Sequence, residues 1–302
     1  MRLTDKMTHA ATLAAGMLIL LFLVLIASQL LRLSLPALRT FGGRFFVSSV
    51  WDPVGEQYGI LPFLYGTIVS SVIALLIAIP FGVGTAIFLT EVAPRRIRGP
   101  IAFMVDMLAA IPSVVYGLWG IFVLAPLVSQ HAAPWLEKYL GFLPLFRGPS
   151  YGVSMLTASL ILSVMIVPYI TAISREILLT VPDDIKAASF ALGATHWETI
   201  WKIVLPYTRA GIGAGIVLAL GRALGETMAV TMLIGNQPQI NVSVLQPGYS
   251  MAAVIANEFT EATTPVYLSA IVAVGLALFA VTLLVNLAAR LLLWRMRVRP
   301  IR

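Results

Sequence analysis

Six long apolar segments constrain this chain more than any other feature of its sequence. They cover residues 13–31, 63–93, 101–128, 153–179, 207–235 and 266–294. A helix needs about 20 apolar residues to cross the hydrocarbon core of a bilayer, so each segment is long enough. Apolar residues make up 59% of the chain and charged residues only 11%, whereas about a quarter of a soluble domain is charged. We therefore predict an all-α integral membrane protein with about six transmembrane helices in a single domain, residues 1–302.

Composition and motifs exclude several kinds of chemistry. The chain has no cysteine, which excludes disulfides and thiolate-bound metals. It has no Gly-x4-Gly-Lys-Ser/Thr loop, so we expect no nucleotide binding of the Walker type and no enzymatic activity. Neither His131 nor His196 has neighbours at metal-ligand spacing, so we expect no metal or other cofactor. The first apolar segment exceeds the core of about 7–15 residues in a secretory signal, which favours an uncleaved anchor.

The basic residues predict how the spans are oriented. With both termini in the cytoplasm, fourteen Lys and Arg lie inside and five lie outside, and Arg222 is the remaining one. The inside set is Arg2, Lys6, Arg95, Arg96, Arg98, Arg175, Lys186, Lys202, Arg209, Arg290, Arg295, Arg297, Arg299 and Arg302. Cytoplasmic loops of membrane proteins carry such an excess of Lys and Arg. The net charge of +7 is therefore explained by contact with membrane lipid and not with nucleic acid.

The fifth apolar segment contains two charged residues, Arg222 and Glu226. A charge near the membrane centre costs at least about 2.5–3.5 kcal/mol on insertion scales. Residues four apart share one face of a helix, so the sequence predicts a neighbouring pair. One interpretation is a self-neutralising pair that helps the helix insert or pack. The other is a charged patch on a polar pathway, where a fixed cation meets an anion in transit.

The third segment contains helix breakers around Pro112. Freed backbone groups at such a kink need another partner in lipid. Ser113 and Tyr116 supply hydroxyl groups there, and these could line the pathway or bond the freed carbonyls. Both alternatives remain open from the sequence. Asp106 lies earlier in the segment, where a carboxylate near the cytoplasmic interface is more often capped or paired than engaged in transport.

Residues 183–206 form a loop between the fourth and fifth segments that has clear helix signals. Asp183 and Asp184 suit the first turn of a helix, where carboxylates complement the helix dipole. Gly193 suits the left-handed position after a helix end. Thr195 and Glu198 have the spacing of a capping box, which starts a second helix. We predict two short helices with a turn at Gly193.

This loop resembles the coupling ("EAA") loop of binding-protein-dependent, ATP-driven import permeases. The family pattern is Glu-Ala-Ala, three residues, Gly, nine residues, then Ile-x-Leu-Pro. The corresponding positions here are Ala187, Ala188, Gly193, Ala194, Ile203, Leu205 and Pro206. The one marked departure is Ala187, which stands where the family has Glu. The resemblance implies the type I ABC importer permease fold, with a coupling helix seated in a cleft of a separate ATPase subunit.

The resemblance covers about residues 60 to 290. The sequences at 108–120 and 221–236, which include Gly-Arg-Ala-Leu-Gly-Glu-Thr-Met-Ala, look like the C-type permease subunit of phosphate importers. That family implies three partners: a second, A-type permease subunit, a dimeric ATP-binding subunit and an extracytoplasmic phosphate-binding protein. It also implies a multi-pass location in the bacterial cytoplasmic (inner) membrane.

We therefore expect the membrane-spanning permease subunit of an ATP-driven inorganic phosphate importer, which forms half of a pathway with alternating access. Phosphate would pass Arg222, whose forked guanidinium group suits its oxygens, and Glu226 would keep binding weak enough for release. Alternatives are the A-type subunit, a permease for another oxyanion such as sulfate or molybdate, and a stand-alone secondary anion transporter. The coupling loop argues against the last, because a self-sufficient carrier needs no docking helix for a motor.

Overall fold

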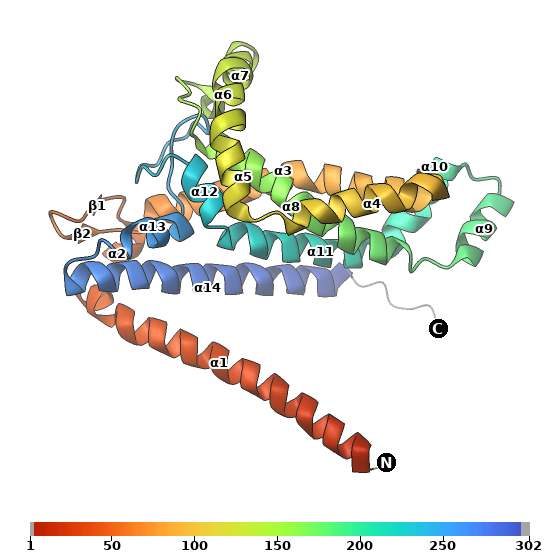
Figure 1. Ribbon diagram of the computed structural model, residues 1–302, viewed down its shortest axis with the longest axis horizontal. Helices are drawn as coiled ribbons and strands as arrows, with labels where there is room; N and C mark the ends of the chain where they lie inside the picture. Colours follow the sequence, from red (N-terminus) through yellow and green to blue (C-terminus); the bar gives the residue numbers. More distant parts are fainter. Residues whose placement is uncertain (1–2, 297–302) are drawn as a thin grey trace.

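The computed structural model describes residues 3–296 and consists almost entirely of helices (Figure 1). Six helical segments are long and apolar enough to cross a membrane, which confirms the predicted number. These segments are Met7–Phe41, Leu61–Val92, Ser113–Leu140, Met155–Leu178, His196–Gly225 and Pro265–Leu291. The terminal basic residues used to predict orientation, Arg2, Arg297, Arg299 and Arg302, lie outside the described part of the chain.

The bounds of the elements are as follows. The α-helices are α1 (Leu3–Phe41), α2 (Arg44–Val47), α3 (Leu61–Ile87), α4 (Arg95–Ala110), α5 (Ser113–Trp119), α6 (Ala125–Leu127), α7 (Ala133–Leu140), α8 (Met155–Leu178), α9 (Asp183–Ala191), α10 (His196–Thr199), α11 (Leu205–Gly225), α12 (Met228–Leu233), α13 (Met251–Glu258) and α14 (Pro265–Met296). Four π-helical turns extend or join them: η1 (Phe88–Val92), η2 (Gly120–Leu124), η3 (Val128–Ala132) and η5 (Ile200–Val204). A 3-10 turn η4 (Pro144–Phe146) and a two-stranded antiparallel hairpin, β1 (Trp51–Asp52) and β2 (Gln57–Tyr58), complete the fold.

The centre of the bundle is the contact between α3 and α8, with α11 packed against both (Figure 1). Small side chains, including the fully buried Ala74, Ala78 and Ala158, allow these helices to approach closely. A Cβ atom on Gly82 would lie only 2.7 Å from Ile170 Cγ2. Lipid tails are as apolar as a helix surface, so close packing of small residues drives helix association in the membrane.

The C-terminal end of the long helix α1 lies beside α14, and the N-terminal end of α1 diverges from the bundle (Figure 1). Pro36 interrupts the main-chain hydrogen bonds of α1. The Ser269 hydroxyl of α14 repairs the helix there: it donates to the Leu33 carbonyl (2.9 Å) and accepts from Ala37 N (3.0 Å). One side chain of α14 therefore bonds α1 on both sides of Pro36.

An aromatic cluster closes the end of the molecule that carries the hairpin. The Glu258 carboxylate accepts hydrogen bonds from Trp51 Nε1 (2.7 Å) and Tyr267 OH (2.8 Å). Tyr58 stacks on Tyr267 with ring centroids 5.4 Å apart. Burial raises the pKa of Tyr58 to about 12, and the nearby carboxylates of Glu56, Glu258 and Asp52 add to that rise. The cluster ties the hairpin to α13 and α14.

The first predicted span, 13–31, is part of the longer helix α1, and two further predicted spans have different bounds in the structure. The third, expected at 101–128, is divided at Ile111 and Pro112: α4 packs along α8, and the apolar helix that follows begins at Ser113 and turns away from the bundle (Figure 1). The fifth, expected at 207–235, begins at His196 and ends at Gly225. Periodicity alone did not reveal these boundaries, because apolar residues continue on both sides of each interruption.

The packing of Gly66 predicts a sharp difference between two glycines of α3. A Cβ atom on Gly66 would lie 2.1 Å from the Tyr249 carbonyl oxygen, whereas one on Gly84 would have no neighbour within 4 Å. We expect Gly66→Ala to destabilise the protein by about 1–3 kcal/mol through overpacking. Gly84→Ala should be neutral or slightly stabilising, because alanine favours helix. Thermal denaturation of the detergent-purified protein measures both; equal stability of the two variants would contradict the packing.

Candidate transport site and coupling region

Arg222 lies in the last turn of α11 and is exposed on the surface of the chain. Its guanidinium carbon lies 4.5 Å from the ring centroid of Tyr169 on α8. A cation over an aromatic face is held by the ring quadrupole while its hydrogen-bond donors remain free. Arg222 is thus oriented by a neighbouring helix and still available to a ligand.

Glu226 does not continue the helix, and here the sequence-based prediction was wrong. The helix α11 ends at Gly225, and the backbone becomes extended at Glu226 (φ −69°, ψ 124°), so the predicted continuous helix is broken there. Among the ion pairs of the described residues, none joins Arg222 to Glu226. Instead, Glu226 Oε1 accepts from Ala229 N (3.4 Å) at the start of α12. Glycine at the end of an apolar run is a helix-stop signal, and Gly225 could have indicated the break.

Near Pro112, the structure shows that one of the two hydroxyl groups, that of Tyr116, bonds a backbone carbonyl. The Tyr116 hydroxyl donates to the Leu108 carbonyl (2.8 Å) across the break between α4 and α5, and the side chain is buried. Tyr116 therefore donates a second hydrogen bond to this carbonyl, which also accepts from Ile111 N (3.4 Å). Ser113, the first residue of α5, is half-buried. Asp106 is exposed on α4.

The two interrupted helices pack directly against each other. A Cβ atom on Gly117 would lie 2.5 Å from Met232 Sδ, and one on Gly120 would lie 2.4 Å from Leu233 Cδ1, so these side chains of α12 pack directly on the glycine backbone of α5 and η2. Interrupted backbone at membrane depth is tolerated only where protein covers it or a water-filled cavity adjoins it. Here protein covers the interruptions, because α5 and η2 pack on α12.

The coupling loop agrees in most respects with the prediction. The helix α9 starts at Asp183, and Gly193 adopts the left-handed conformation (φ +84°). Thr195 and Glu198 form the predicted capping box, and Glu198 pairs with Lys202 (3.0 Å). Of the positions that resemble the family pattern, Ala187 and Ala188 are exposed on α9, and Ala194 is half-buried after the turn.

The second helix of the loop is not short. It continues without interruption from His196 to Gly225 as the fifth span, so Ile203, Leu205 and Pro206 lie inside a continuous helix. Pro206 therefore does not mark the exit of the loop. A proline inside an α-helix clashes with the carbonyl four residues earlier, and the wider π turn η5 directly before Leu205 accommodates it.

Apolar side chains are exposed around α9, at the opposite end of the molecule from the hairpin (Figure 1). Leu192 is 90% exposed and Phe190 is 45% exposed. The Phe190 ring stacks on His196 at 6.2 Å, which holds it in place across the turn. Apolar side chains that are exposed together outside the spans indicate a surface for a protein partner.

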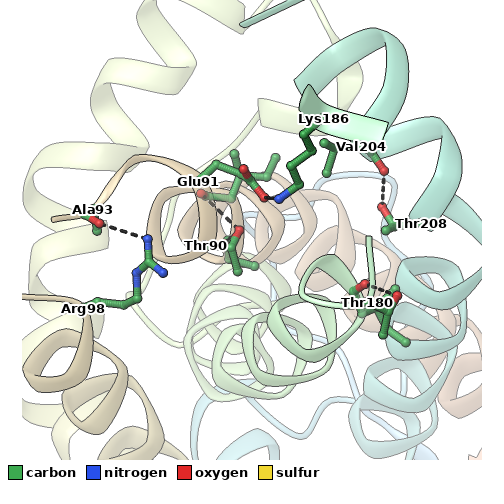
Figure 2. A network of polar contacts seen from close by, with 11 residues as sticks. Thr90, Glu91, Ala93, Arg98, Thr180, Lys186, Val204 and Thr208 are labelled. Carbon is green, nitrogen blue, oxygen red and sulfur yellow. Dashed lines mark hydrogen bonds and ion pairs between the residues drawn. The ribbon is translucent and has the colours of Figure 1, made fainter. Parts of the chain in front are cut away.

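Two side-chain contacts attach α9 to the spans. Lys186 Nζ lies 2.7 Å from Glu91 Oε1 in η1, and Figure 2 shows the two side chains directed at each other. Both are largely buried, with exposures of 18% for Lys186 and 8% for Glu91. Ser189 and Thr199 join their hydroxyl groups at 2.9 Å. Sequence reasoning did not identify Glu91, although a lone carboxylate at the end of the second apolar segment is unusual.

An apolar groove of about 790 Å³ lies between the last turns of α3 and the first turns of the fifth span. Trp197, Trp201 and Leu205 form one wall, with Arg209 beside them. Ile87 and Phe88 belong to the other wall. The two walls belong to the second and fifth spans, the helices to which α9 is attached.

The family model of the binding-protein-dependent transport system inner membrane component matches residues 78–298. The chain belongs to this family. It is 48% identical over 301 residues to the phosphate transport system permease protein PstC of Mesorhizobium japonicum, an alignment that covers 98% of this chain and 92% of the relative. It is also 48% identical over 287 residues to the PstC protein of Xylella fastidiosa strain Temecula1, with 94% and 88% covered.

A solved bacterial ABC transporter involved in the import of the acidic polysaccharide alginate has the same fold. Its TM-score is 0.63 at 17% identity, over 98% of this chain and 99% of the other. This chain is therefore a multi-pass inner-membrane transport component with the type I ABC importer permease fold, as the sequence predicted.

The left-handed backbone of Gly193 predicts how α9 responds to substitution. A Cβ atom there would meet no neighbour within 4 Å, so only backbone strain opposes a side chain. We expect Gly193→Val to cost about 1–3 kcal/mol and to accelerate amide hydrogen exchange across residues 183–195. Gly193→Asn should remain near wild type, because asparagine tolerates this conformation. Unchanged protection in the valine variant would show that the turn is not needed to hold α9.

Proposed function

We propose that this chain is the C-type permease subunit of an ATP-driven phosphate importer and forms half of a pathway with alternating access. The observation that carries the proposal is the helix α9, with exposed apolar side chains at its C-terminal end, attached to the ends of two spans. It is supported by 48% identity to a phosphate transport permease over 98% of this chain. That similarity favours phosphate over sulfate or molybdate, and the C-type over the A-type subunit.

The chain needs partners to perform this function. We propose a second, A-type permease subunit opposite the exposed Arg222, and a dimeric ATP-binding subunit that receives Phe190 of α9 and Leu192 directly after it. An extracytoplasmic phosphate-binding protein delivers the ion at the end that carries the hairpin. ATP hydrolysis takes place on the partner chain, and this subunit converts the resulting movement into reorientation of its spans.

Within the pathway, Arg222 supplies the cation. Its guanidinium carbon lies 4.5 Å from the centre of the Tyr169 ring, and its forked donors can form two parallel hydrogen bonds with one phosphate. Glu226 stands at the break that follows, where its negative charge repels a bound anion. Transport requires binding that is strong enough for entry and weak enough for release. We propose that Arg222 and Glu226 set this balance by acting separately on the ion in the pathway, and not by forming a direct ion pair.

The first test concerns orientation, with both termini in the cytoplasm. The chain has no cysteine, and Tyr151 (72% exposed) and Leu192 (90% exposed) are suitable for labelling. A thiol reagent that cannot cross the membrane should label Tyr151→Cys in intact cells and Leu192→Cys only after permeabilisation. The reverse pattern would place α9 on the side without ATP and refute the proposed function.

The second test measures uptake of radiolabelled phosphate by the assembled complex in liposomes, with sulfate and molybdate as competitors. Arg222→Gln should lower uptake per complex by about 10–100-fold, the usual effect of losing a hydrogen bond to a charged group. Arg222→Lys should restore it only in part, because a point charge lacks the fork. The control is Arg39→Gln, an exposed arginine on α1, which should transport normally.

Glu226→Gln distinguishes a transport role from a packing role. A transport role predicts altered phosphate uptake with a normal amount of complex in the membrane. A packing role predicts loss of the complex from the membrane. Uptake at the wild-type rate by the Arg222→Gln/Glu226→Gln double variant would remove both charges from the mechanism.

A further inference from the structure

The Glu91–Lys186 ion pair differs from the other two ion pairs of the described residues. Those pairs, Arg175–Glu176 and Glu198–Lys202, join residues close in sequence and are more exposed. Glu91 and Lys186 are 95 positions apart, and Glu91 is only 8% exposed. A buried charge that loses its partner remains uncompensated, so such a pair strongly resists separation. This contact therefore makes α9 follow the end of the second span.

The second attachment of α9 leads to a different span. Thr199 donates to the Thr195 carbonyl (3.1 Å), which leaves Ser189 as the donor in the buried Ser189–Thr199 hydrogen bond. Thr199 precedes η5 within the continuous helix of the fifth span. The helix α9 thus bridges the ends of two helices, and these helices form the two walls of the apolar groove.

Both attachments lie at π-helical turns, η1 at Glu91 and η5 after Thr199. A π turn carries one extra residue and is a common place for a helix to change its local geometry. From η1, α3 reaches α8 through the hydrogen bond from Thr171 to the Gly82 carbonyl (3.1 Å). Tyr169 lies on the same helix, two positions before Thr171. Near the other end of the fifth span, Arg222 lies over the Tyr169 ring.

We propose that Glu91 and Lys186 are positioning residues for transport, which transmit displacement of α9 to the second span while Ser189 and Thr199 transmit it to the fifth. The two routes converge on the contact between Arg222 and Tyr169. A movement of α9 then changes the groove and this contact together. The inference rests on the proposed function, in which an ATPase displaces α9.

The experiment uses the complete complex in liposomes and measures three quantities: assembled complex, ATP hydrolysis and phosphate uptake. Glu91→Gln and Lys186→Met should each lower the phosphate transported per ATP hydrolysed by about tenfold, within the range usual for coupling between sites. The exchanged pair, Glu91→Lys with Lys186→Glu, should restore most of that ratio. The matched control is Glu176→Gln, which removes a carboxylate from an exposed ion pair outside the coupling loop and should leave the ratio unchanged.

A purely structural role of the pair has a different signature. It predicts less assembled complex but a wild-type ratio of phosphate to ATP in what remains, and that result would overturn the inference. Failure of the exchanged pair to restore the ratio would overturn it as well. A wild-type complex that hydrolyses ATP without moving phosphate would refute the proposed function itself. Normal wild-type uptake with unaffected single variants would refute only the role of Glu91 and Lys186.

Discussion

The structure depends on one constraint: a bilayer offers no water to backbone groups, so every interruption of a helix needs a partner within the protein. Three interruptions have such a partner in a side chain. Tyr116 bonds the Leu108 carbonyl before Pro112, Ser269 bridges the main chain at Pro36, and Glu226 accepts from the first turn of α12. Because each of these bonds joins two elements, the interruptions also hold neighbouring elements together.

The two ends of the molecule use different physical means to stay folded. At the hairpin end, large aromatic rings surround the Glu258 carboxylate, and the donors of Trp51 and Tyr267 satisfy it. At the coupling end, a short helix is held by a buried ion pair and by a pair of hydroxyl groups. Fully satisfied polar contacts are rigid and directional. The hairpin end therefore combines a satisfied carboxylate with ring packing, whereas α9 is held by polar side-chain contacts.

Local features could be predicted from the sequence, and contacts between distant segments could not. The capping box at Thr195 and the left-handed Gly193 depend on residues within four positions, and both are confirmed. The end of the fifth span at Gly225 was missed, because apolar residues continue beyond it and hid the glycine signal. The pairing of Glu91 with Lys186 has no local signature, since only the packing of α9 on η1 brings the two together. The six apolar segments and the family pattern predict the architecture, whereas the contacts between distant side chains are visible only in the structure.

The hydroxyl bridge at Ser269 has a consequence for the reach of the N-terminal helix. From Pro36 to the beginning of α1 at Leu3 the helix is about 50 Å long, at about 1.5 Å per residue. With a lever of that length, a change of about 10° at the bridge would move the far end by about 9 Å. The Ser269 bridge therefore lies where a small rotation of α1 would give the largest displacement of its N-terminal end.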